Sequence, residues 1–250
     1  MSLVRRRTRA LEPPPWEELA AIEWDPASIF EHAYRRLRPS APLPRIEVTF
    51  RAFAGMNHRV RLADGCLDVR LSDLLAGAPP SVLEALAAIL LSKLYRRHAP
   101  AASRTRYRRW VNSTAVCQRI LTVRRARGRK HAGPAQGHRD LEVLFDKLNG
   151  EYFGGRLRRP RLGWSRRLTR THLGHYDPAH DTIVLSRLLD QPKVAACLPE
   201  FILYHEMLHV RFPVEVCNGR RRVHSREFLR EEKRFTQYHE ARAALRALLA

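Results

Sequence analysis

The sequence predicts an α+β protein made of two small domains, and three observations support this. The chain has 250 residues and an apolar fraction of 44%, which is enough to form packed cores. Residues 85–139 contain no Asp or Glu and separate two segments of mixed charge. The second segment combines helical apolar patterns with short strand-like runs. We therefore expect an N-terminal arm at residues 1–25, a basic α+β domain at 26–123, a basic linker at 124–139 and a second α+β domain at 140–250.

The second domain is predicted to run from a helix through short strands to two further helices. Apolar residues at helical spacing indicate the first helix at residues 140–152, and Gly154 and Gly155 end it. Short apolar runs then predict antiparallel strands at 162–165, 173–176 and 182–185. A long helix follows at 192–212. Ser225 can cap a last helix toward the C-terminus, whose charged residues 231–234 are expected to face solvent.

The helix at 192–212 carries the sequence His205-Glu206-Met207-Leu208-His209. Histidines four residues apart lie on one face of a helix, so both imidazoles can bind the same ion. In this arrangement Glu206 does not bind the metal and acts as the general base, while one catalytic zinc lowers the pKa of its bound water to about 7. The apolar flanks of the motif are typical of a buried active-site helix. The alternative is an accidental match on a surface helix.

A catalytic zinc needs a third protein ligand and an open fourth position. Glu215 is a weak candidate, because the longer histidine motif of some zinc peptidases requires a glycine where this chain has Phe212. His224 and Glu227 both lie at suitable distances along the chain. Spacing alone leaves these two candidates open.

The net charge of +21 and the pI near 11.1 indicate a polyanionic partner, with DNA as the first candidate. The alternative is a basic surface with no specific partner. The candidate contacts to nucleic acid or substrate are Arg106, Arg108, Arg109, Arg124, Arg125, His172 and His175. The two histidines lie near the strand at 173–176 and could equally be ordinary strand or turn residues.

The four cysteines contain no CxxC pair, which excludes a zinc ribbon within this sequence. No apolar run reaches the roughly 18 residues of a membrane span, and no apolar stretch of a secretory signal follows the first basic residues. We therefore expect a cytoplasmic protein without membrane contact.

The stretch from about residue 141 to 235 resembles the SprT-like (Spartan-related) metallopeptidase domain. The matching features are an opening helix at 144–157, a hairpin at 164–176 with Gly174, a strand at 182–189, the motif at 205–209 and the segment 223–228. The resemblance implies a zincin fold, one zinc held by His205, His209 and His224, and Glu206 as the catalytic base. Bacterial members usually carry a Cys-rich zinc ribbon after this domain. This sequence has none, so any affinity for nucleic acid is expected to come from elsewhere.

The expected function is that of a zinc metalloendopeptidase acting on DNA-associated or DNA-crosslinked proteins, because the family is best known for this activity. One alternative is a general metallopeptidase without DNA involvement. Another is a non-catalytic, zinc-containing protein that binds nucleic acid. Glu206 and the open fourth ligand position favour an enzyme over a structural zinc site.

The first domain is interpreted as a degenerate copy of the second. Residues 29–37 parallel 144–152, residues 67–75 parallel 183–189, and residues 89–96 can be aligned with 202–209. In this alignment Ser92, Lys93 and Arg96 replace His205, Glu206 and His209, so the copy has lost its metal ligands and gained a basic face. The alternative is an unrelated α+β domain.

Overall fold

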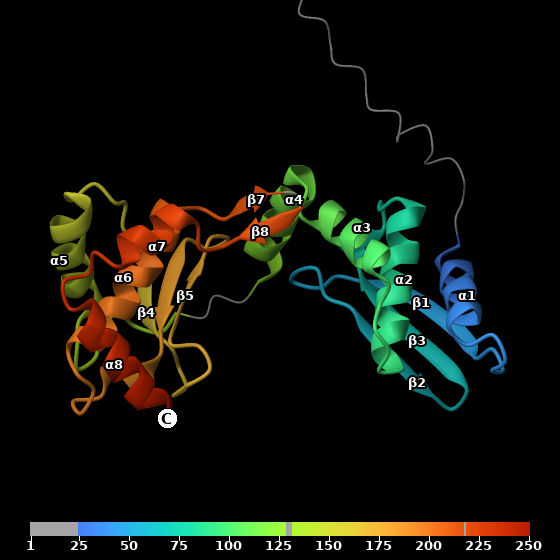
Figure 1. Ribbon diagram of the computed structural model, residues 1–250, viewed down its shortest axis with the longest axis horizontal. Coiled ribbons are helices and arrows are strands. Elements are labelled where there is room, and N and C mark those ends of the chain that lie inside the picture. Colours follow the sequence, from blue (N-terminus) through green and yellow to red (C-terminus); the bar gives the residue numbers. More distant parts are fainter. Residues whose placement is uncertain (1–24, 129–131, 218) are drawn as a thin grey trace, which may run out of the picture. The chain divides into compact units, whose positions relative to one another are not determined.

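The computed structural model describes residues 25–128, 132–217 and 219–250 (Figure 1). The predicted N-terminal arm therefore lies outside the described residues except for Asp25, as do residues 129–131 of the predicted linker. The described chain is a mixture of helices and small sheets, which confirms the predicted α+β class. Contacts divide it into two units. The N-terminal unit ends at Tyr107 and the C-terminal unit begins at Arg108, except that the short stretch Phe53–Met56 groups with the C-terminal unit. This division lies before the boundary at residue 123 that the sequence suggested.

The N-terminal unit is built around a three-stranded sheet. Its elements are α1 (Pro26–Leu37), β1 (Arg45–Arg51), β2 (Arg59–Ala63), β3 (Cys66–Ser72), the 3-10 helix η2 (Asp73–Leu75) and α2 (Pro80–Leu94). The carboxylate of Asp25 accepts hydrogen bonds from the backbone N–H groups of Ala27 and Ser28 and so caps α1. In the sheet, β3 lies in the centre, parallel to β1 and antiparallel to β2. Alternate residues of β3, including Leu67 and Val69, are fully buried in the core.

The C-terminal unit contains a second sheet of the same kind. Its central elements are α5 (Leu141–Phe153), β4 (Arg161–Trp164), β5 (Gly174–Asp177), β6 (Thr182–Leu185), the 3-10 helix η3 (Arg187–Asp190) and α6 (Cys197–Arg211). β6 lies between the other two strands, antiparallel to β5 but parallel to β4. The expectation that all three strands are antiparallel is therefore wrong for β4. The chain passes from β4 to the far edge of the sheet before β5 and β6 form a hairpin, so β4 and β6 run in the same direction.

The two units have the same order of elements and the same sheet topology. In each, a helix is followed by two strands that form the edges of the sheet and a third strand that lies between them. A 3-10 helix and a long helix come next. A buried serine lies at the end of the central strand: Ser72 is the last residue of β3, and Ser186 directly follows β6. Each serine hydroxyl accepts a hydrogen bond from the backbone N–H two residues later and so caps its 3-10 helix. This similarity reaches from the topology to a single capping side chain.

The remaining helices begin with α3 (Ala101–Val111) and α4 (Thr114–Arg127). The sequence predicted a linker from residue 124, whereas α4 continues through Arg127. Near the other end of the predicted linker, the guanidinium of Arg139 donates hydrogen bonds to the carbonyls of Leu189, Gln191 and Val194. Residues next to α5 are thus fixed to the C-terminal unit.

The segment after α6 differs from the prediction in two ways. A hairpin of β7 (Glu215–Cys217) and β8 (Arg220–Arg222) precedes the last helices. These strands were not predicted, because they are short and exposed and so lack an apolar pattern. The single last helix is wrong, because α7 (Arg226–Glu232) and α8 (Tyr238–Leu249) are separate. Phe235, between them, is buried against aromatic residues of α5 and α6, which turns the chain. None of the described helices is long and apolar enough to cross a membrane.

Candidate metal centre

The first two candidate ligands lie on α6, whose apolar residues anchor it in the core. Leu203, Tyr204, Met207 and Leu208 are each at most 1% exposed. His205 and His209 occupy the neighbouring, partly exposed face one turn apart. Pro213 follows the end of the helix, and a residue before proline is disfavoured in helical geometry. The burial of one face thus holds the other face, with both imidazoles, in a fixed position.

The third histidine comes from the turn that leads into α7. The hydroxyl of Ser225 accepts a hydrogen bond from the N–H of Phe228 (3.1 Å), so Ser225 caps α7 as the sequence predicted. Phe228 is fully buried, and its ring centroid lies 4.7 Å from those of His209 and His224. The cap and this ring place His224 beside the two histidines of α6.

The three imidazoles converge on one point. Nε2 of His209 lies 3.2 Å from Nε2 of His205 and 3.3 Å from Nε2 of His224. One nitrogen from each ring lies within 4.8 Å of the others. A tetrahedral zinc with bonds of 2.0–2.1 Å needs ligand atoms about 3.3 Å apart, so this donor set fits zinc. Three neutral imidazoles would also leave a fourth position for a water or substrate.

The electrostatic surroundings suit metal binding. Burial, together with the neighbouring His205, lowers the pKa of His209 to about 4, so the ring is neutral at pH 7, as a ligand must be. The Nδ1–H of His205 donates a hydrogen bond of 2.6 Å to Glu232. Burial tends to raise the pKa of the Glu232 carboxyl, but the hydrogen bond and charge of His205 outweigh it, so this pKa lies below its usual value.

Glu206 lies between the histidines on α6 and is only 5% exposed. Burial raises its pKa to about 7, and His205 and the backbone of Tyr176 only partly oppose this shift. Strand β5 passes close to the carboxylate, because a Cβ added to Gly174 would lie 2.9 Å from Oε1 of Glu206. A carboxyl group with a pKa near 7 can both accept and release a proton at neutral pH.

The other candidate ligands do not join this cluster. Glu227 is exposed on α7 and Glu215 is exposed on β7. Of the two histidines considered for substrate contact, His175 lies on β5 and His172 just before it, and both are exposed. The structure thus brings His224, and not Glu227, to the histidines of α6.

The candidate basic contacts are distributed over α3 and α4. Arg106 belongs to the N-terminal unit, whereas Arg108 and Arg109 begin the C-terminal unit, and all three are exposed. Arg124 and Arg125 already have partners in the β5–β6 turn: Arg124 lies 3.4 Å from the Asp177 carboxylate, and Nε of Arg125 donates to the Ala179 carbonyl.

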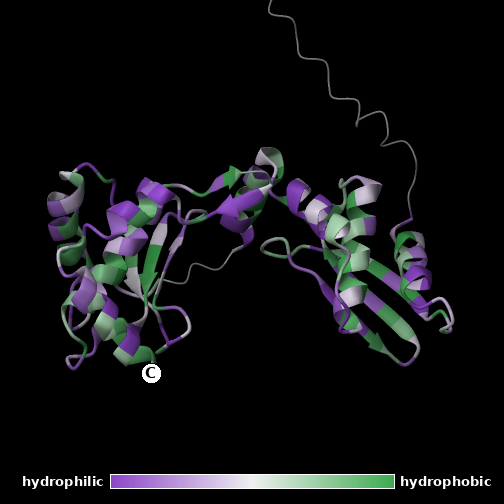
Figure 2. Ribbon diagram, in the orientation of Figure 1, coloured by the Kyte–Doolittle hydropathy of each residue, from purple (hydrophilic) through white to green (hydrophobic). Residues whose placement is uncertain are grey.

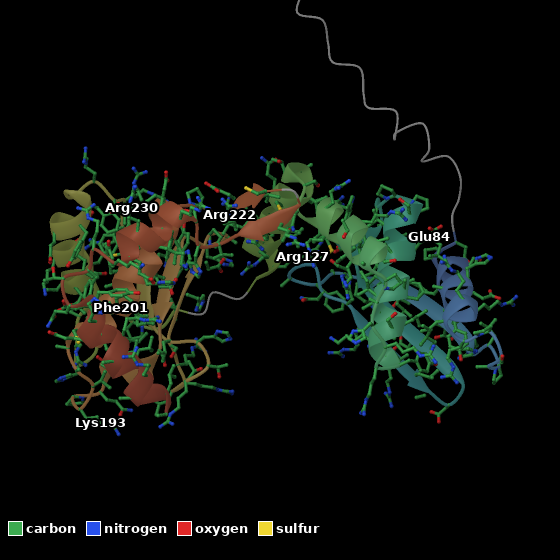
Figure 3. All side chains as sticks on the ribbon, in the orientation of Figure 1. Glu84, Arg127, Lys193, Phe201, Arg222 and Arg230 are labelled. Carbon is green, nitrogen blue, oxygen red and sulfur yellow. The ribbon has the colours of Figure 1, made fainter. Side chains whose placement is uncertain are left out.

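Sequence reasoning missed two features of this region. Glu232 was expected to face solvent with its charged neighbours, but it is 8% exposed and contacts His205, so that expectation is wrong for Glu232. Its position four residues after Phe228, on the same face of α7, was the available signal. The second feature is β8, whose arginines Arg220–Arg222 are exposed two residues before His224 (Figure 2; Arg222 is labelled in Figure 3). The Nδ2 of Asn112 donates to the carbonyl of Gly219 at the turn of this hairpin (2.7 Å).

Comparison with known proteins gives one match. The model of the SprT-like family matches residues 141–245, from the start of α5 into α8, and the matched segment contains the three histidines, Glu206 and Glu232. No curated protein and no solved structure matches the chain.

Proposed function

We propose that this protein, whose residues 141–245 match the model of the SprT-like family, is a zinc metalloendopeptidase that acts on DNA-associated or DNA-crosslinked proteins. The family match supports a zincin-like metallopeptidase in general terms. The observation that carries the proposed zinc-dependent peptidase chemistry is the convergence of three imidazole nitrogens beside the buried carboxyl group of Glu206.

His205, His209 and His224 would hold the zinc. When bound, zinc supplies a Lewis acid that polarises the substrate carbonyl and makes water a stronger acid. Glu206, with its pKa near 7, accepts the proton of the attacking water and passes it to the leaving amine. Strand β5 is at the edge of its sheet and runs beside Glu206, so an extended substrate chain could pair along this edge.

Involvement of DNA is supported by charge. The chain carries a net charge of +21, and the exposed arginines of β8 end two residues before the third histidine. Arginines on such a surface neutralise phosphates and release counterions, so binding should weaken steeply with salt. Cytoplasmic residence, expected from the sequence, stays a prediction.

The test compares the wild type with Glu206→Gln, using a basic DNA-binding protein as substrate, with and without single-stranded DNA. We expect cleavage that depends on DNA in the wild type and no cleavage in the variant, with zinc bound in both. Glu227→Gln, on the exposed side of α7, is the matched control and should cleave normally. Cleavage without DNA would favour a general metallopeptidase, and bound zinc without cleavage would favour a non-catalytic protein that binds nucleic acid.

We also propose that the N-terminal unit is a repeat of the C-terminal one without a metal site. The shared topology supports this, and α2, the counterpart of α6, contains no histidine. Lys93 and Arg106 are exposed on this unit and could bind phosphate. Lys93→Ala combined with Arg106→Ala should lower DNA affinity and its salt dependence while zinc content is unchanged. Unchanged DNA binding would contradict a phosphate-binding role.

A further inference from the structure

A buried carboxylate contacts the first candidate ligand on the side away from the other two. Oε1 of Glu232 lies 2.6 Å from Nδ1 of His205, whereas Nε2 of the same ring faces His209. Glu232 is 8% exposed. In the described part of the chain, no carboxylate lies within ion-pair distance of His209 or His224. The contact with Glu232 therefore distinguishes His205 from the other two candidate ligands.

The end of α7 that carries Glu232 is fixed by contacts on both sides. The hydroxyl of Tyr204, on α6 next to His205, donates a hydrogen bond of 2.8 Å to the carbonyl of Glu231. At the other end of α7, Ser225 caps the helix and Phe228 is buried against the three histidine rings. The backbone thus presents the carboxylate to His205 at a set distance.

We propose that Glu232 is the positioning residue of the metal centre: it accepts the Nδ1–H of His205 and so holds Nε2 of that ring free to bind the metal. The inference rests on the metal site of the proposed function and adds a residue to it.

The physical reason lies in the two nitrogens of a neutral imidazole. Only one of them carries hydrogen, and the other donates its lone pair to a metal. A carboxylate at Nδ1 selects the form with hydrogen at Nδ1, fixes the ring plane and makes Nε2 more basic. Without this carboxylate, the His205 ring would rotate freely and exchange between its two neutral tautomers in the metal-free protein. Both freedoms would be lost when the metal binds. Such outer partners typically change metal affinity about 10–100-fold.

The test uses Glu232→Gln and Glu232→Ala in the full chain, with Glu227→Gln as the matched control on the exposed face of the same helix. Zinc affinity is measured by competition with a chelator, and the hydrogen position on His205 by 15N NMR of the metal-free protein. We expect about 10–100-fold weaker zinc binding in Glu232→Ala, a smaller loss in Glu232→Gln and none in Glu227→Gln. The NMR spectrum of metal-free Glu232→Ala should show His205 in a mixture of both neutral forms, and Glu232→Asp should restore part of the affinity.

Two results would overturn the proposal. One is wild-type zinc affinity and an unchanged His205 spectrum in Glu232→Ala. The other is weaker binding in Glu232→Gln together with a lower melting temperature of the metal-free protein and no change at His205, because Glu232 would then only support the fold. Cleavage is not among the readouts, so a wild type that binds zinc without cleaving would remove the proposed function and leave this inference standing.

Discussion

Gly174 provides a sensitive test of how β5 and Glu206 fit together. A Cβ at this position would lie 2.7 Å from Cγ2 of Ile202 and 2.9 Å from Oε1 of Glu206. Contacts this short do not persist, so either α6 or the carboxylate must move. Both neighbours are buried, at 8% and 5% exposure, which leaves little room for relaxation. The conflict is steric, because Gly174 does not have the positive φ that favours glycine.

The expected magnitude for Gly174→Ala follows from overpacking of a core, which costs about 1–3 kcal/mol. For a unit of this size that corresponds to a melting temperature lower by roughly 3–9 °C. Displacement of a catalytic group by up to 1 Å reduces rates about 100-fold, so we expect cleavage to fall about 10–100-fold. Zinc content should be unchanged, because the closest contacts of the added methyl are with Ile202 and Glu206 and not with the three histidines.

The assays are thermal unfolding, zinc content and cleavage of the substrate used above. Gly150→Ala is the matched control, because a Cβ there meets nothing within 4 Å and the position lies inside α5. It should raise stability by about 0.5–1 kcal/mol, as expected for alanine in place of a helical glycine. A Gly174→Ala variant as stable and as active as the wild type would refute the close approach of β5 to Glu206.

Two further predictions concern the third ligand and a buried histidine. His224→Ala should lower zinc affinity at least about 100-fold while Glu227→Ala retains it, measured as bound zinc after dialysis; the reverse result would make Glu227 the ligand. Burial lowers the pKa of His58 to about 4, and Tyr107 contacts its Nε2 (2.7 Å). As pH falls, the unfolded chain therefore binds a proton at His58 before the folded chain does. The free energy of unfolding should fall by about 2 kcal/mol between pH 6.5 and pH 4, after allowance for solvent screening. Melting temperatures between pH 7 and 4.5 should fall more in the wild type than in His58→Gln; equal slopes would contradict the shift.

The sequence by itself determined the features that depend on neighbours along the chain. Histidines four apart within an apolar helix predict two imidazoles on one face, because helix geometry alone sets that spacing. Ser225 was predicted as a cap, and the structure has it in that role because a cap acts within a few residues. The strand positions around Leu162, His175 and Ile183 followed from apolar runs and turn residues.

Only the tertiary structure decided the features that depend on contacts between distant residues. His224 and Glu227 are three residues apart, and only the docking of α7 through Phe228 brings the first to α6 and leaves the second exposed. The partnership of Glu232 with His205 spans 27 residues, and no local pattern specifies it. The parallel pairing of β4 with β6 likewise depends on which strand takes the centre of the sheet. Local spacing fixes which chemical groups a segment presents, whereas packing of the whole chain fixes which of those groups meet.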